Sequence, residues 1–217
     1  MKQLIYFLIL SLLPFVLNAA NAEKVTTNIP QAKTVALTFD DGPNPIDTPK
    51  ILAILKKYHI KATFFVVGAN AKLYPEMLKA IHDDGHVIAS HSQTHPMLTK
   101  ISHAQLKNEI ELPVKIIHNI LGIYPKCLRY PFGASNAYVR EQIRLAGMLP
   151  TSMGFNSFDY ERPGTQKIVD WVLKNVYSKQ VILMHDGYAK REQTVAALPQ
   201  IIEGVKRKGL GFSTICG

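Results

Sequence analysis

Short runs of apolar and β-branched residues alternate with longer stretches of helical pattern from residue 34 onward. Each short run is almost continuously hydrophobic, which is typical of strands buried on both faces of a parallel sheet. The strands predicted in this way cover residues 34–39, 62–67, 86–90, 127–130, 150–153, 181–184 and 211–214. The predicted helices cover residues 49–58, 75–83, 103–121, 136–146, 166–176 and 195–206.

This alternation predicts a single α/β domain. The number of strand–helix units favours a distorted (β/α) barrel of about seven parallel strands over an open, doubly wound sheet. Ser102 and Gln105 form a capping-box pattern before the third predicted helix, and Thr194 is the expected N-cap of the last one. Pro113 predicts a kink within the third helix.

Residues 1–22 have the features of a secretory signal peptide. Lys2 precedes an apolar stretch that reaches Leu17, and Ala20-Asn21-Ala22 supplies an A-x-A cleavage site. The apolar stretch is short for a membrane span, and no stop-transfer pattern follows it. We therefore expect a domain over residues 23–217 that is secreted, periplasmic or in the cell envelope, with no stable membrane span after signal removal. An uncleaved N-terminal anchor is the alternative.

The formal net charge is +9, but the basic residues are scattered. No basic stripe with interleaved aromatic residues occurs, so we expect no nucleic-acid partner, and solubility is a sufficient explanation of the charge. The two cysteines, Cys127 and Cys216, lie in the part of the chain expected to be exported. They could form one disulfide or remain two buried thiols, and the sequence favours neither.

Ionisable residues gather where the predicted strands end. Parallel βα folds place their chemistry at the carboxyl ends of the strands, so these residues predict one site. They are Asp40, Asp41, His91, Arg129, Asp159 and His185.

Asp41, His91 and His95 are the predicted metal ligands. The adjacent carboxylates of Asp40 and Asp41 repel each other, and a cation would relieve that repulsion, although a solvated turn is the simpler alternative. His91 and His95 are four residues apart, which would place both imidazoles on one face of a helical turn. One carboxylate and two imidazoles suit one divalent metal, best Zn²⁺, with Co²⁺, Mn²⁺, Ni²⁺ and Fe²⁺ left open. The histidines read as structural or solvent-facing are His59, His82, His86, His103 and His118.

Arg129 and the turn after it form a further candidate segment. Arg129 could satisfy a structural carboxylate or, if that carboxylate is Asp40, orient it. The stiff turn at Pro131-Phe132-Gly133 could aim backbone N–H groups at the site, as an oxyanion hole requires. In the later segments, an Asp159 that hydrogen-bonds His185 would raise the pKa of the imidazole and suit it to act as a general acid.

Five segments of the chain resemble, in the same order, the motifs of the NodB-homology polysaccharide deacetylases (carbohydrate esterase family 4). The resemblance covers about residues 34–214. The five segments are Thr38-Phe39-Asp40-Asp41-Gly42-Pro43, His91-Ser92-Gln93-Thr94-His95-Pro96, Arg129-Tyr130-Pro131-Phe132-Gly133, Asn156-Ser157-Phe158-Asp159-Tyr160 and Leu183-Met184-His185. The resemblance implies a distorted barrel that removes N-acetyl, or sometimes O-acetyl, groups from an acetylated glycan.

The resemblance also implies a role for each matched residue. Asp40 resembles the catalytic base, and Arg129 matches the residue that orients it. The backbone N–H of Phe132 matches the oxyanion donor. The further matches are Asp41, His91 and His95 as metal ligands, His185 as the acid tuned by Asp159, and Leu183 as the lining of the acetyl-methyl pocket. We also expect Tyr130 and Tyr160 to contact the substrate.

One motif departs from the family pattern. The fourth usually reads Asp-x-x-Asp-Trp, and here Tyr160 stands where the tryptophan usually walls the site, so a wider or differently selective pocket is expected. Trp171 lies in a helical pattern and is predicted to pack in the core.

We expect a monomer acting on acetylated glycan. The alternatives are an O-acetyl esterase, a catalytically silent glycan-binding module and, more weakly, an Asp-x-Asp phosphohydrolase, whose second carboxylate would fall at Gly42. Specificity in such folds depends on loops, so the sequence does not name the glycan.

Overall fold

The computed structural model describes residues 32–188 and 190–217. The predicted signal peptide lies outside this range. Over the described residues, every helix is too short or too polar to cross a membrane. The strands are β1 Thr34–Asp40, β2 Thr63–Val66, β3 Val87–Ser90, β4 Cys127–Arg129, β5 Leu149–Thr151, β6 Phe155–Asn156, β7 Val181–His185 and β8 Gly211–Phe212.

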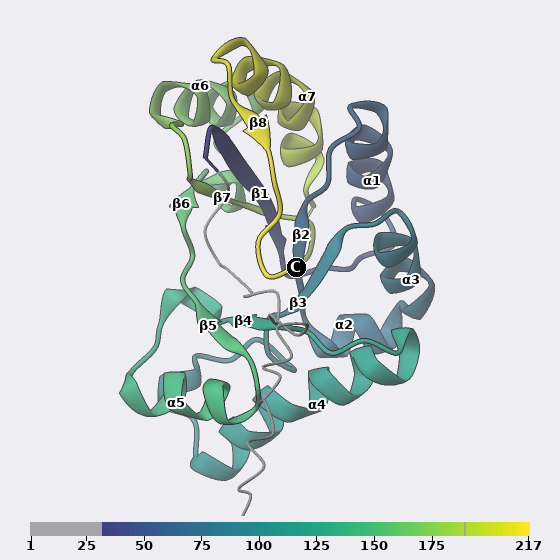
Figure 1. Cartoon of the computed structure of the whole chain (residues 1–217), viewed down its shortest axis with the longest axis vertical. Helices are drawn as coiled ribbons and strands as arrows, with labels where there is room; N and C mark the ends of the chain where they lie inside the picture. Colours follow the sequence, from purple (N-terminus) through teal and green to yellow (C-terminus); the bar gives the residue numbers. More distant parts are fainter. Residues whose placement is uncertain (1–31, 189) are drawn as a thin grey trace, which may run out of the picture.

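The strands form one parallel sheet in the order β5-β4-β3-β2-β1-β7-β6, and β8 pairs with the start of β1. β5 and β6 follow one another along the chain but form opposite edges of this order. The short segment 152–154 therefore crosses between the two edges, and the sheet is curled into a half-barrel (Figure 1). The predicted α/β fold, a distorted (β/α) barrel, is confirmed.

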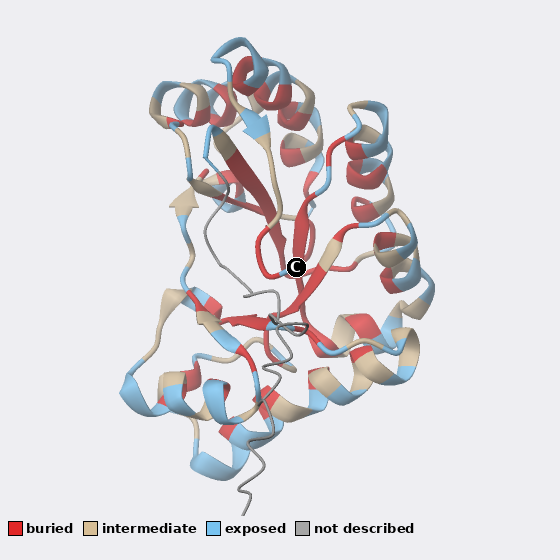
Figure 2. Ribbon diagram, viewed as in Figure 1, coloured by how far each residue is buried: buried red, intermediate tan, exposed pale blue. Residues whose placement is uncertain are grey.

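Helices cover the outside of the half-barrel, and in Figure 1 α5 lies beside β5 and α6 lies above β6. Their faces toward the sheet are buried and their outer faces are exposed (Figure 2). The helices are α1 Thr48–Lys57, α2 Gly68–Leu73, α3 Pro75–Asp83, α4 His103–Leu121, α5 Ala137–Leu145, α6 Thr165–Asn175 and α7 Glu192–Arg207.

The two faces of β1 separate packing from chemistry, because successive side chains of a strand point in opposite directions. One face joins the large core beneath the helices through Val35, Leu37 and Phe39. The other face looks into the half-barrel, where small and polar side chains leave room for the site. Its residues are Ala36, Thr38 and Asp40.

The C-terminal segment closes the amino-terminal end of the half-barrel. Ile215 and Cys216 pack with Ala36 and Cys127 in a separate small core. The hydroxyl of Thr63 donates to the carbonyl oxygen of Ile215 at 2.9 Å. Cys127 and Cys216 form a disulfide with Cα atoms 5.7 Å apart, so of the two alternatives left open by the sequence, the disulfide is the one observed.

Two predictions about elements are corrected, and one short helix was missed. The strand expected at 150–153 is β5, which ends at Thr151, followed by the separate short strand β6. Thr194 is not an N-cap, because α7 begins at Glu192 with Arg191 as its N-cap, and Thr194 is buried inside the first turn. The short helix α2 was not predicted.

The remaining start signals hold. The Ser102 side chain accepts a hydrogen bond from the Gln105 backbone, and the capping box is complete. α4 continues through Pro113 as one helix, and the kink expected at this residue stays a prediction.

Candidate active site

The carboxyl ends of the central strands surround a cavity of about 330 Å³. The sheet register explains why the predicted residues meet there, since Asp40 at the end of β1 is paired with His185 at the end of β7. His91 follows the last residue of β3, on the other side of β1 and β2. The side chains that line the cavity are Asp40, Asp41, His91, His95, Tyr130, Phe132, Met153, Asn156, Tyr160, Leu183 and His185.

The adjacent carboxylates Asp40 and Asp41 are both buried and face different partners. Asp40 Oδ1 accepts a hydrogen bond from Nη1 of Arg129 at 2.6 Å. Asp41 has a φ of 77°, and its Oδ1 lies 3.5 Å from His91 Nε2 and 3.3 Å from His95 Nε2. The left-handed backbone at Asp41 therefore turns the second carboxylate toward the histidines.

Arg129 is completely buried inside the half-barrel. Its guanidinium also donates to Thr38 Oγ1 at 2.9 Å and to the carbonyl oxygen of Ser152 at 3.1 Å, and it lies 3.9 Å from the centre of the Phe65 ring. A buried charge is tolerated only when it is paired and hydrogen-bonded. These contacts satisfy that condition and hold Asp40 in one orientation.

Asp41, His91 and His95 form a possible metal site, because their ligand atoms all lie within 4.8 Å of one another. Asp41 Oδ1 is buried and has no hydrogen-bond partner among the described residues. His91 Nδ1 lies 2.8 Å from the carbonyl oxygen of Arg129, which requires the proton on Nδ1 and leaves Nε2 free to bind a metal. The three residues thus fit a divalent cation.

The protonation states of Asp41 and His95 also favour metal binding. Burial raises the pKa of Asp41, but the electrostatic interactions with His91, His185 and His95 outweigh it, so the pKa lies below its ordinary value and the carboxylate is ionised. Burial, followed by the charge of His91, lowers the pKa of His95, which favours the neutral imidazole. An ionised carboxylate and a neutral imidazole are the forms that bind a metal.

The two histidines do not lie on a helical turn, as their spacing suggested. Ser92 and His95 have φ values of 66° and 63°, so the segment is a non-helical loop. The loop is held by Glu109 of α4, which accepts hydrogen bonds from the backbone N–H groups of Gln93 and Thr94 at 2.9 and 2.8 Å. Both imidazoles reach the site because of this loop conformation.

His185 is paired with a fully buried carboxylate on the other side of the cavity. Its Nδ1 lies 2.7 Å from Asp159 Oδ1, and its backbone N–H donates to Asp159 Oδ2 at 2.9 Å. Thr194 and Ser157 also donate to this carboxylate, at 2.7 and 3.1 Å. Burial lowers the pKa of His185, but the hydrogen bond and charge of Asp159 outweigh it, so the pKa is raised above 6.5.

Aromatic and apolar side chains form the cavity walls. Phe132 has a φ of 59°, which is rare for a bulky residue, and its ring packs edge-on against His95 at 4.6 Å between ring centres. Tyr160 packs edge-on against His185 at 5.6 Å and remains 44% exposed. Leu183 is buried at the base of the cavity.

Trp171 is not a core residue. It is 41% exposed, and its indole N–H donates to the carbonyl oxygen of Asn156 at 2.9 Å. Its ring packs against Phe158 with ring centres 5.4 Å apart. Trp171 therefore supports the Asn156–Tyr160 segment from outside the cavity. The helical pattern identified the helix correctly but not the face on which Trp171 lies.

Of the five histidines expected to be structural or solvent-facing, none lines the cavity or belongs to the metal-type cluster of the described residues. His86 is buried and accepts a hydrogen bond from the Ala62 backbone at 3.1 Å, and burial lowers its pKa to about 4. His103 and His118 stack on Tyr138 and Tyr124.

Sequence reasoning did not identify Asp186 or Arg191. Asp186 is buried and accepts hydrogen bonds from the Gly42 backbone at 3.1 Å and from Thr48 Oγ1 at 2.6 Å, and burial raises its pKa to about 7. A Cβ at Gly42 would lie 2.1 Å from this carboxylate, so the turn after Asp41 requires glycine. Asp186 directly follows His185, which was the available signal. Arg191 lies in no motif.

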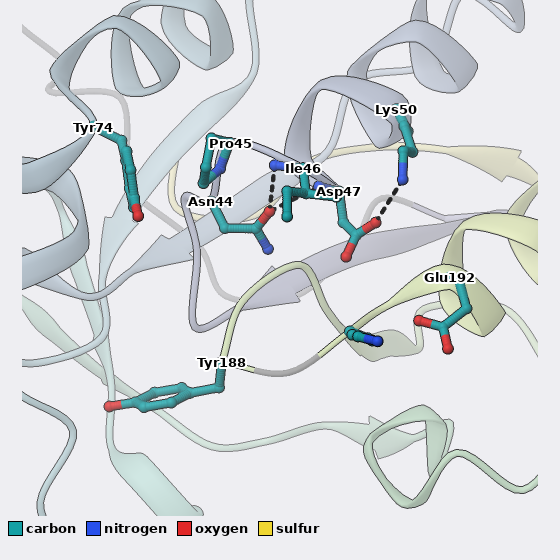
Figure 3. A pocket seen from close by; sticks show the side chains of 9 residues that line it. Asn44, Pro45, Ile46, Asp47, Lys50, Tyr74, Tyr188 and Glu192 are labelled. Carbon is teal, nitrogen blue, oxygen red and sulfur yellow. Dashed lines mark hydrogen bonds and ion pairs between the residues drawn. The ribbon is translucent and has the colours of Figure 1, made fainter.

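Tyr188 lines a second cavity of about 780 Å³, and its ring packs against His95 with ring centres 5.0 Å apart. Figure 3 shows segment 44–47 in this cavity, with Lys50 paired to Asp47, and with Tyr74, Tyr188 and Glu192 around it.

A half-barrel with a cavity at its carboxyl edge, lined by paired ionisable side chains, is typical of an enzyme active site. A family model described as polysaccharide deacetylase matches residues 27–150, more than half of the chain. The chain belongs to the polysaccharide deacetylase family and is a polysaccharide deacetylase.

Named relatives extend the match over most of the chain. A peptidoglycan-N-acetylglucosamine deacetylase of Bacillus cereus is 34% identical over 194 residues, covering 88% of this chain and 91% of that protein. A chitooligosaccharide deacetylase of Bradyrhizobium sp. is 33% identical, covering 82% of this chain and 86% of that protein. A solved peptidoglycan N-acetylglucosamine deacetylase, in complex with 4-naphthalen-1-yl-N-oxidanyl-benzamide, has a TM-score of 0.80 at 35% identity, with 84% and 86% of the two chains covered.

The raised pKa of His185 depends on Asp159. We expect Asp159→Asn to lower the pKa of His185, because burial is then opposed only by the weaker effects of the Asp40 and Asp41 charges. In the natural protein the imidazole of His185 stays protonated to a higher pH than an ordinary histidine does. In the variant it would lose its proton at a lower pH. An NMR titration of the histidine side chains in metal-free protein measures this. Asp170→Asn, on an exposed part of α6, is the matched control and should leave the titration unchanged. The assignment is contradicted if both variants titrate like the natural protein.

Proposed function

We propose that this polysaccharide deacetylase hydrolyses the N-linked acetyl group of an N-acetylglucosamine-type sugar in a glycan of the cell envelope. One observation carries the proposal: a carboxylate held by a buried arginine and an imidazole held by a buried carboxylate are paired in register across one cavity, beside a possible metal site. The relatives named for peptidoglycan and chitooligosaccharide support the choice of an N-acetylated glycan.

Asp41, His91 and His95 would hold one divalent metal, for which this donor set favours Zn²⁺. When bound, such a metal supplies Lewis-acid polarisation of the acetyl carbonyl and of the attacking water. His91 is oriented for this by the carbonyl oxygen of Arg129, and His95 by its loop, in which its backbone N–H donates to Ser92 Oγ at 3.0 Å.

Asp40 is the proposed general base. Its Oδ1 is occupied by Arg129, whereas its Oδ2 is directed to the metal side and lies 3.7 Å from His91 Nε2. Oδ2 is therefore the atom that accepts the proton of the attacking water. The ion pair with Arg129 keeps Asp40 out of the ligand set, which leaves it free to act as a base.

The backbone N–H of Phe132 is the proposed donor to the oxyanion that forms when water adds to the carbonyl carbon. The 3₁₀ turn Pro131–Gly133 follows β4 after the single residue Tyr130, and the left-handed φ of Phe132 is the kind of strained backbone that clusters at active sites. A preorganised backbone donor stabilises charge that develops in the transition state, and it costs no reorganisation.

His185 is the proposed general acid. An amine leaves poorly unless it is protonated, so breaking the carbon–nitrogen bond requires a proton at the sugar nitrogen. Asp159 accepts from Nδ1 of His185, which leaves Nε2 to deliver that proton and to stay protonated at higher pH than an ordinary histidine would. The products are acetate and the free sugar amine.

Leu183 and its neighbours are proposed to hold the acetyl methyl group. Leu183 lies at the base of the cavity, and Tyr130 and Tyr160 form the walls where sugar contacts are expected. Because Tyr160 is smaller than the usual tryptophan, we propose that this wall admits a bulkier sugar substituent. Location in the cell envelope agrees with the predicted signal peptide and with relatives that are named for peptidoglycan.

Acetate release tests the proposed reaction. Zn²⁺-loaded protein should release acetate from at least one of N-acetylated peptidoglycan, chitin oligomers and an N-acetylated exopolysaccharide. Asp40→Asn should reduce the rate by roughly 10² to 10⁴-fold, the range expected for loss of a general base. No release from any of the glycans by the natural protein would contradict the proposal. Glycan binding without release would instead indicate a silent binding module.

His185→Ala separates amide from ester hydrolysis. The variant should lose at least roughly 10²-fold in rate on an N-acetylated glycan and much less on an O-acetylated one, because without a proton donor an alkoxide leaves more readily than an unprotonated nitrogen. The comparison uses kcat for both substrates with the natural protein and the variant. Equal losses on both, together with a faster natural rate on the ester, would favour the O-acetyl esterase alternative.

A further inference from the structure

Arg191 is a buried arginine that the mechanism above does not use. It is the N-cap of α7 and is 4% exposed. Its Nε donates to the carbonyl oxygen of Gly187 at 2.7 Å, and its backbone N–H donates to Asp47 Oδ2 at 2.9 Å. Asp47 in turn pairs with Lys50 in the second cavity (Figure 3). These contacts fix the stem of Arg191 between two loops.

The remaining end of the guanidinium faces the possible metal ligand Asp41. Nη2 of Arg191 lies 3.7 Å from Asp41 Oδ2, while Asp41 Oδ1 faces the two histidines. The two oxygens of one carboxylate are thus divided between a cation on one side and the metal side on the other. Nη1 has no hydrogen-bond partner among the described residues.

The loop that carries Arg191 is packed directly on the backbone of Asp41. A Cβ at Gly187 would lie 2.1 Å from the carbonyl oxygen of Asp41, so only glycine permits this approach. Asn70 of α2 donates to the same carbonyl oxygen at 2.7 Å. The backbone of Asp41 is therefore fixed from two sides.

We propose that Arg191 is a positioning residue for the metal ligand Asp41, as Arg129 is for the base Asp40. Arg191 holds Oδ2, so that Asp41 presents Oδ1 alone to the metal. The proposal rests on the metal site of the proposed function. A guanidinium so close to the site also repels a divalent ion. Among the described residues, Arg191 is the one ion-pair partner of Asp41 Oδ2. We therefore expect the gain from orienting the carboxylate to exceed the repulsion of the metal.

Metal affinity tests the role independently of catalysis. Arg191→Gln in otherwise natural protein should weaken Zn²⁺ binding by roughly 10-fold or more, as removal of an outer-shell partner of a metal ligand does. Arg191→Lys should recover part of the affinity, because lysine keeps the charge but lacks the planar fork that donates to Gly187. The dissociation constant is measured on metal-stripped protein by competition with a chromophoric chelator. The unfolding midpoint without metal is recorded for each variant.

The controls separate positioning from general damage. Arg144→Gln, which removes an exposed arginine paired with Glu141, should bind Zn²⁺ like the natural protein. Unchanged affinity in Arg191→Gln and Arg191→Lys, with only a lower unfolding midpoint, would overturn the proposal and leave Arg191 a structural residue. Tighter binding in Arg191→Gln would overturn it as well. If Arg191→Gln does not fold, Arg191→Lys against Arg144→Gln decides. Natural protein that binds no divalent metal would overturn the metal site itself.

Discussion

Two adjacent carboxylates buried at the end of β1 are the constraint around which the rest of the site is arranged. Asp40 and Asp41 cannot both be ionised in a low-dielectric interior without nearby cations or hydrogen-bond donors. Arg129 faces Asp40 at 2.6 Å, and Arg191 faces Asp41 at 3.7 Å. The remaining oxygen of each carboxylate is directed toward His91. Similar side chains thereby receive different environments, which suits one to be a base and the other a ligand.

The half-barrel makes this arrangement possible. Small residues on the inner face of β1, such as Ala36 and Thr38, leave space for the whole Arg129 side chain, which lies on the Phe65 ring. The C-terminal segment fills the opposite end and is tied to β4 through Cys127. The outer faces of the same strands bury large apolar residues under the helices, where the hydrophobic contribution to stability is greatest. Stability and chemistry thus come from opposite faces of the same strands.

Local pattern predicted most of the fold and the gathering of ionisable residues. α3 and α4 were predicted at their observed bounds, because long amphipathic stretches and a capping box are strong local signals. α2 and β6 were missed because each is too short to show a period. The left-handed loop at Ser92 and His95 was also missed, because non-glycine residues rarely adopt such backbone and nothing local marks it.

Other features depend on tertiary contacts that no spacing reveals. The pairing of Cys127 with Cys216 follows from where the C-terminus enters the half-barrel. Thr194 was identified as a cap from its residue type, but its hydroxyl donates to Asp159 at 2.7 Å. Arg191 gave no signal at all, because its importance comes from the approach of the Gly187 loop to Asp41.

The division of work between Asp40 and Asp41 is tested most directly by measuring Zn²⁺ affinity and acetate release on the same two variants, Asp40→Asn and Asp41→Asn. Asp40→Asn should bind Zn²⁺ with nearly natural affinity and release almost no acetate, because it removes a base and not a ligand. Asp41→Asn should lose both, because an uncharged amide is a much poorer ligand than a carboxylate. Equal loss of metal affinity in the two variants, or retained acetate release in Asp40→Asn, would contradict the account.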